Sequence, residues 1–107
     1  MYVIRRVWET KPGEARRAAS IAAAIGRIYE DVGQRDPARI YFNSGTTPGT
    51  KNRVYMEWTA ETIESPYRGD NDLPDTGGLG ARLRDITDAT YIEFYELLTP
   101  DKTMALD

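Results

Sequence analysis

The 107-residue sequence contains no histidine and no cysteine, and each absence removes a class of chemistry. Without cysteine the chain forms no disulfide and offers no thiolate nucleophile, which fits a reducing compartment. Without histidine it lacks the commonest metal ligand, the commonest general base and the usual protein ligand of haem. We therefore predict a cytoplasmic protein that uses no metal, haem or other cofactor.

Long apolar runs and an excess of positive charge are also missing. No stretch approaches the roughly 20 apolar residues that a membrane-spanning helix needs. The net charge is -3, so there is no broad basic surface of the kind that attracts nucleic acid. We predict neither a membrane nor a nucleic-acid partner, and a chain of this length predicts a single domain over residues 1–107.

Hydrophobic periodicity predicts four strands and two helices. The strands are expected over residues 2–9, 38–44, 52–59 and 90–98, and a helix with apolar residues at intervals of three and four is expected over residues 14–32. A short second helix is expected to begin near Gly78, after a loop over residues 65–80 whose Gly, Pro and Asp content suggests a lid. The order β-α-β-β-α-β is typical of an α+β ferredoxin-like fold, with a four-stranded antiparallel sheet in the order 4-1-3-2 and both helices on one face.

The strict alternation within each strand divides the side chains between two faces of this sheet. The helices are expected to cover Val3, Val7, Ile40, Phe42, Val54, Met56, Trp58, Ile92 and Phe94. The uncovered face is then expected to carry Ile4, Arg6, Trp8, Tyr41, Asn43, Tyr55, Glu57, Tyr91, Glu93 and Tyr95. An exposed patch this rich in aromatic residues marks an interaction site, and a symmetric homodimer that packs two sheets face to face would bury it.

The first strand and the turn after it resemble those of NIPSNAP-like proteins. In that family a strand containing arginine and an aromatic residue runs into a Lys-Pro-Gly turn, which Arg6, Trp8, Lys11, Pro12 and Gly13 match, whereas Arg5 stands where an apolar residue is usual. The element order resembles the dimeric α+β barrel superfamily, which includes antibiotic-biosynthesis monooxygenase-like and EthD-like domains. The resemblance implies a homodimer with a cavity in each subunit, between the sheet and its helices or inside the barrel. It also implies small hydrophobic or aromatic ligands, which some members oxidise, cyclise or isomerise without metal or flavin.

Arg6, Glu57 and Glu93 are the predicted catalytic residues, because all three are expected on the uncovered face of neighbouring strands. A sheltered carboxylate with a raised pKa acts as a base near neutral pH, and an adjacent arginine stabilises a substrate oxyanion. The alternative interpretation is a structural ion pair between strands.

The aromatic residues of the same face are predicted to bind a planar substrate by stacking and by phenolic hydrogen bonds. Packing in a dimer interface is the alternative for them, and a strand-end hydrogen bond is the alternative for Asn43. The predicted substrate-binding residues are Trp8, Tyr41, Asn43, Tyr55, Tyr91 and Tyr95.

These observations lead to one functional prediction and two alternatives. We predict an enzyme that acts on a small aromatic or polyketide-like molecule without metal or haem, as a cofactor-independent oxygenase, cyclase or isomerase. The first alternative is a non-catalytic, NIPSNAP-like ligand-binding or interaction module. The second is a purely structural dimer, which a filled interior would favour.

Overall fold

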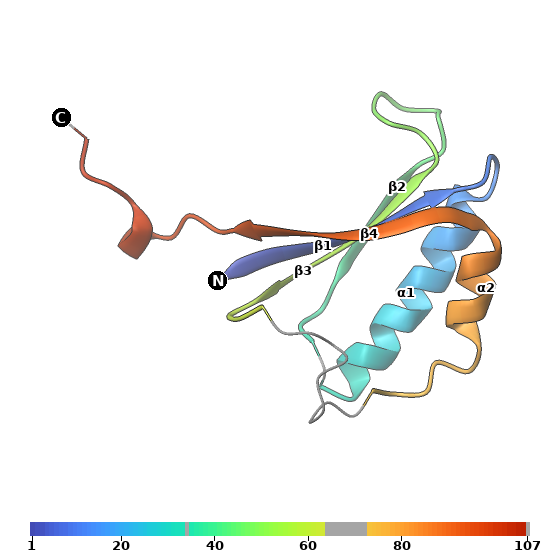
Figure 1. Ribbon diagram of the computed structural model, residues 1–107, viewed down its shortest axis with the longest axis horizontal. Helices are drawn as coiled ribbons and strands as arrows, with labels where there is room; N and C mark the ends of the chain where they lie inside the picture. The colour runs from blue at the N-terminus through green and yellow to red at the C-terminus, as the bar shows by residue number, and fades with distance from the viewer. Residues whose placement is uncertain (34, 64–72, 107) are drawn as a thin grey trace.

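The computed structural model describes residues 1–33, 35–63 and 73–106, which form a sheet with two helices on one of its faces (Figure 1). The elements follow in the order β1 (Tyr2–Thr10), α1 (Ala15–Asp31), β2 (Arg39–Asn43), β3 (Arg53–Ala60), α2 (Leu79–Asp85) and β4 (Thr87–Glu96), and a 3-10 helix, η1 (Pro100–Lys102), follows the sheet. This order confirms the predicted ferredoxin-like α+β fold. The first half of the predicted lid over residues 65–80, residues 65–72, lies outside the described residues.

The sheet is antiparallel throughout, with the strand order β2-β3-β1-β4. This is the predicted order, read from the opposite edge. The two central strands, β1 and β3, pair along nearly their whole length, from Tyr2 opposite Ala60 to Glu9 opposite Arg53. Both central strands contribute side chains to the site described below.

Helix α1 packs against the sheet through small residues on its buried face. Ala18 and Ala22 are fully buried, and Gly26 lies so close to β3 that a Cβ atom there would stand 3.3 Å from the Met56 Cε atom. The helix ends where Gly33, with φ of 74°, donates its N–H to the Glu30 carbonyl oxygen over 3.0 Å. Glycine adopts this backbone conformation without the strain that a Cβ atom would cause, so Gly33 suits the end of the helix.

The two sets of side chains of β1 lie on the opposite faces of the sheet from those predicted. Its register places Ile4 opposite Trp58 and Trp8 opposite Val54, so Ile4, Arg6 and Trp8 face the helices. Val7 faces away from the helices but is still fully buried, because Tyr55 and Tyr91 flank it on the two neighbouring strands. The prediction that Arg6 and Trp8 lie on the same face as Glu57 and Glu93 is therefore wrong.

The core lies between α1 and the centre of the sheet, where Val54 and Met56 are almost completely buried. Helix α2 is much shorter than α1 and covers only one end of β4. Ile92 and Phe94 therefore face the helical side but remain 40% and 42% exposed. This incomplete cover leaves space beneath the sheet.

The end of the described chain extends away from the sheet and helices (Figure 1). It includes η1 and the exposed side chains of Leu98, Met104 and Leu106. Among the residues that the structure describes, no helix is both long enough and apolar enough to cross a bilayer.

Candidate functional site

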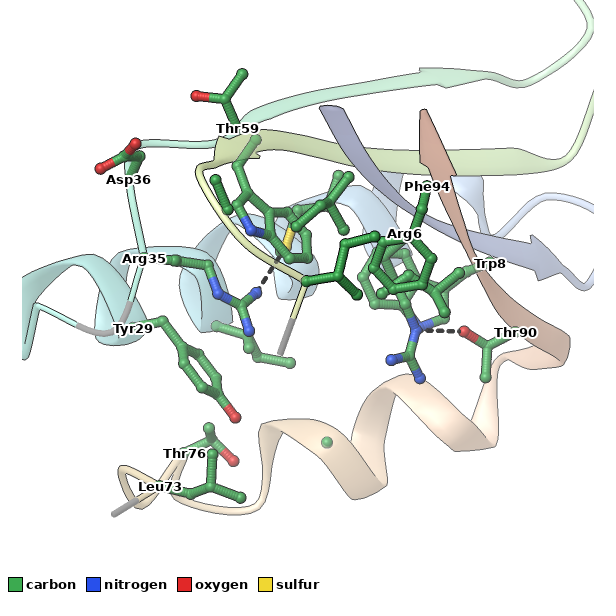
Figure 2. A pocket seen from close by; sticks show the side chains of 18 of the residues that line it. Arg6, Trp8, Tyr29, Arg35, Asp36, Thr59, Leu73, Thr76, Thr90 and Phe94 are labelled. Atoms are coloured by element: carbon green, nitrogen blue, oxygen red, sulfur yellow. Dashed lines mark hydrogen bonds between the residues drawn. The ribbon is translucent and has the colours of Figure 1, made fainter. Parts of the chain in front are cut away.

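A cavity of about 1130 Å³ lies between the sheet and the two helices (Figure 2). Its walls come from β1, β3 and β4 above and from α1, α2 and the segment between α1 and β2 below. Much of the lining is apolar or aromatic, including Ile4, Trp8, Trp58, Leu83, Ile92 and Phe94. Polar and charged side chains, among them Arg6, Arg35 and Thr90, lie between these apolar groups. A cavity that combines apolar walls with polar groups is the usual form of a small-molecule site.

Arg6 brings a positive charge into this cavity from the centre of β1. Its Nε atom donates a hydrogen bond to Thr90 Oγ1 over 2.9 Å, and the Thr90 hydroxyl donates in turn to the Val7 carbonyl oxygen over 3.0 Å. Its guanidinium carbon also lies 5.8 Å from the centre of the Trp8 ring. These contacts fix the orientation of Arg6 through Nε, and its two terminal nitrogens form no hydrogen bond with the described residues.

Arg35 brings a second positive charge from the segment between α1 and β2. Its guanidinium carbon lies 4.1 Å from the centre of the Tyr29 ring and 4.3 Å from that of Trp58, and Nη1 lies 3.5 Å from the Met56 sulfur. Figure 2 shows the Arg35 side chain pointing into the cavity beside Tyr29, while Asp36 points away from it. Burial lowers the pKa of Arg35, and the positive charge of Arg6 lowers it further.

The opposite face of the sheet carries a cluster of charged and aromatic side chains, which we call the open-face cluster: Arg5, Arg39, Tyr41, Tyr55, Glu57, Glu93 and Tyr95. Arg5 forms a salt bridge with Glu93, with Nη2 2.7 Å from Oε1, and its guanidinium lies over the rings of Tyr55 and Tyr95. Interaction with the Tyr41 hydroxyl and with the Glu93 carboxylate raises the pKa of Arg5 above its ordinary value. Arg5, which the sequence analysis did not select, thus occupies the central place predicted for Arg6.

Glu57 in the same cluster is not poised as a base. It accepts hydrogen bonds from Arg39 and from the Tyr41 hydroxyl, the latter over 3.0 Å, and the Tyr41 ring stacks on Tyr55 at 5.0 Å. Partial burial raises the pKa of Glu57, but these two donors outweigh it, so the pKa lies below its ordinary value. The prediction of a raised pKa is therefore wrong for Glu57, and the ion-pair interpretation describes its surroundings better.

The remaining predicted residues divide between the two faces. Asn43 donates to the carbonyl oxygens of Thr47 and Pro48 over 3.2 and 3.1 Å, so it stabilises the turn after β2, as the alternative interpretation held. Tyr91 lies on the open face, opposite Val7. Trp8 is 9% exposed and lines the cavity instead of the face predicted for it.

Sequence reasoning missed Arg35 and Tyr29, and the reasons differ. Arg35 lies between helix and strand, in a segment without periodicity, so no pattern assigned its side chain a direction. Tyr29 lies on the inward-facing stripe of α1, four residues after Ile25, but a tyrosine in such a stripe does not by itself indicate a cavity. No cluster of acidic side chains suited to a metal ion occurs in the described parts of the chain.

Comparison with known proteins connects this geometry to solved structures. No protein-family model matches the chain, and no curated protein matches it. The structure is similar to that of an uncharacterized NIPSNAP domain protein from Burkholderia xenovorans, with a TM-score of 0.56, 18% identity, and 94% of this chain and 97% of that chain covered. It is also similar to a structural-genomics target from Agrobacterium tumefaciens, with a TM-score of 0.52, 15% identity, and 90% and 92% of the two chains covered. Together with the element order and strand order, these similarities show that the chain has a NIPSNAP-like α+β fold.

Proposed function

We propose that this domain binds a small hydrophobic molecule, aromatic or polyketide-like, in the cavity between the sheet and the helices. The observation that carries the proposal is the cavity itself, with its apolar walls and two inward-facing guanidinium groups. Its volume of about 1130 Å³ is slightly larger than the roughly 300–1,000 Å³ of most small-molecule sites. The described residues leave this space open rather than filled, which weighs against a purely structural role.

Binding without catalysis fits the described residues better than the predicted glutamate chemistry does. Glu57 and Glu93 do not line the cavity, and both accept charge-assisted hydrogen bonds from arginines on the other face of the sheet. A general base needs a pKa near the working pH, whereas the pKa of Glu57 lies below its ordinary value.

The second candidate is a cofactor-independent oxygenase, cyclase or isomerase that uses the same cavity. Its support is the pair Arg6 and Arg35, since guanidinium groups in apolar surroundings stabilise an oxyanion that develops during reaction. A simple test is the exchange of the α-protons of 2-tetralone for deuterium, followed by NMR in heavy water. Exchange faster than in buffer, and lost in Arg35→Met, supports catalysis; exchange at the buffer rate rejects enolate chemistry on this ketone.

The proposed binding site is tested by two substitutions at adjacent positions of β4. Phe94 faces the cavity and is 42% exposed, whereas Tyr95 faces the opposite side of the sheet and is 48% exposed. The probes are 2-naphthoate and its neutral analogue 2-naphthamide. Binding is measured by calorimetry and by quenching of Trp8 and Trp58, the only tryptophans of the chain, both of which line the cavity.

Phe94→Ala is expected to weaken binding of a naphthalene probe by about two- to tenfold, because it removes one aromatic wall. Tyr95→Ala removes a ring of similar size and exposure from the other face and is expected to leave the affinity unchanged. The opposite pattern would place the site in the open-face cluster. Failure of both probes to bind would reject the proposed function.

A further inference from the structure

The charged side chains on the two faces of the sheet are paired in different ways. On the open face, Arg5 pairs with Glu93, Arg39 with Glu57, and Arg53 with Glu9. On the cavity side, no carboxylate of the described residues lies within salt-bridge distance of Arg6 or Arg35. Both cations face a common space whose walls are largely apolar.

A cation in such surroundings is stabilised only in part by the contacts that the structure shows. The rings of Tyr29 and Trp58 attract the Arg35 guanidinium through their π faces, but they neutralise no charge. Arg6 donates one hydrogen bond to a neutral group, the hydroxyl of Thr90. Removing charged groups from water costs free energy unless a counter-charge is supplied, and these two charges also repel each other.

The remaining N–H donors of the two guanidinium groups indicate which kind of ligand group would supply the counter-charge. Arg6 retains both terminal nitrogens, which form the planar fork that binds a carboxylate through two parallel hydrogen bonds. Arg35 holds its guanidinium between two aromatic rings, next to the space where the apolar part of a ligand would lie. Among the described residues, the other charged side chains of the lining are Arg84, Asp36 and Glu61, all exposed, so the described lining carries an excess of one positive charge.

We propose that the ligand of this cavity is an aromatic or similarly apolar monocarboxylic acid, whose carboxylate is bound by Arg6 and Arg35 and whose body packs against Trp8, Trp58 and Phe94. This inference rests on the proposed function and specifies the chemical class of its ligand. A single negative charge matches the excess charge of the lining. A dianion such as a phosphate monoester would carry one negative charge more than the described lining offsets.

The test compares 2-naphthoate with 2-naphthamide, which has the same ring system and no charge. The wild-type protein is expected to bind the acid about ten- to a hundredfold more tightly than the amide, since hydrogen bonds to charged groups contribute more than neutral ones. Added salt is expected to weaken binding of the acid and to leave the amide nearly unaffected. The dianion 2-naphthyl phosphate serves as a third probe and is expected to bind more weakly than the acid.

Two cavity variants and one surface variant locate the effect. Arg35→Met and Arg6→Met are each expected to remove most of the preference for the acid, because they weaken binding of the acid far more than binding of the amide. Arg27→Met removes an exposed arginine from α1 outside the cavity lining and is expected to preserve the preference. Thermal melts verify folding; if Arg6→Met does not fold, Arg35→Met and Arg35→Lys decide, with the lysine variant expected to retain part of the preference.

The possible failures separate the two proposals. Equal binding of acid and amide, or a preference for the acid that survives in both arginine variants, overturns the carboxylate proposal and leaves an apolar binding site in place. Tighter binding of 2-naphthyl phosphate than of 2-naphthoate overturns the choice of a monoanion. Binding of none of the three probes overturns the proposed function as well.

Discussion

At the scale of single residues, Arg5 and Arg6 are neighbours in β1 whose side chains serve opposite faces of the sheet: Arg5 pairs with Glu93, and Arg6 lines the cavity. An arginine was expected beside Glu93 on the open face, and Arg5 is there, while Arg6 faces the cavity. Adjacent residues of a strand point to opposite faces of the sheet. Assigning β1 the wrong way round therefore exchanges the predicted positions of Arg5 and Arg6. Arg35 was beyond prediction because the segment that holds it has no periodicity.

The Arg5–Glu93 pair provides the first residue-scale prediction. Both side chains are about one-third exposed, 31% and 29%, so the pair is intermediate between a surface and a buried salt bridge. Glu93→Gln is expected to lower the free energy of unfolding by roughly 1–2 kcal/mol, and Arg5→Met in the same chain is expected to recover part of that loss. Denaturant unfolding of the two single variants and the double variant measures the coupling.

Ligand binding distinguishes a structural pair from a functional one. Because Glu93 lies on the face away from the cavity, Glu93→Gln is expected to leave the affinity for 2-naphthoate unchanged. A loss of affinity at full stability would restore Glu93 to the functional site.

Glu57 provides a prediction about pH. Its pKa in the folded protein lies below the ordinary value of 4.5, so its contribution to stability is complete above about pH 4.5 and is lost as the pH falls through the folded pKa. Glu57→Gln is therefore expected to flatten the fall in stability below about pH 4.5, by less than about 1 kcal/mol, because Arg39 is largely exposed. Urea unfolding at pH 7 and at stepwise lower pH tests this; identical pH profiles of variant and wild type would count against it.

At the scale of elements, the alternation of residues predicted which side chains of a strand share a face. It did not predict whether that face contacts the helices or lies on the open side of the sheet. In β1 both sets are partly apolar, Val3 and Val7 against Ile4 and Trp8, so composition favoured neither. The larger set, with Trp8, faces α1, while tyrosines of the neighbouring strands bury Val7 on the other side. The strand order was predictable because the split β-α-β arrangement permits few topologies.

Close packing of α1 on β3 leads to the element-scale prediction. Gly26 is buried, and the Met56 Cε atom lies 3.3 Å from where a Cβ would be. Gly26→Val is expected to destabilise by about 1–3 kcal/mol through overpacking. Arg27→Val, at the next and exposed position, introduces the same β-branched side chain without the contact and is expected to cost less than about 1 kcal/mol. Thermal unfolding compares the two; equal costs would mean that α1 moves to accommodate the larger residue.

At the scale of the whole molecule, the sheet is covered on one face only. The cavity lies under the covered face, and the open face exposes Tyr41, Tyr91 and Tyr95 to between 36% and 48%. Aromatic side chains in one patch on an otherwise charged face are typical of a protein interface. The sequence predicted this patch correctly in β2, β3 and β4, where the assignment of faces was right.

The proposed homodimer follows from this open face and is the last prediction. Two copies that pack sheet against sheet would bury the tyrosines and shelter the Arg5–Glu93 pairs, so light scattering at micromolar concentration is expected to give twice the chain mass of 12.1 kDa, or about 24 kDa. Tyr95→Asp places an additional acid beside Glu93 on both copies and is expected to shift the protein toward the monomer, whereas Arg27→Asp on the exposed side of α1 leaves the dimer intact. A wild-type monomer would reject the sheet-to-sheet dimer. A Tyr95→Asp monomer that still binds 2-naphthoate would show that the cavity functions within one subunit, because its described walls come from a single chain.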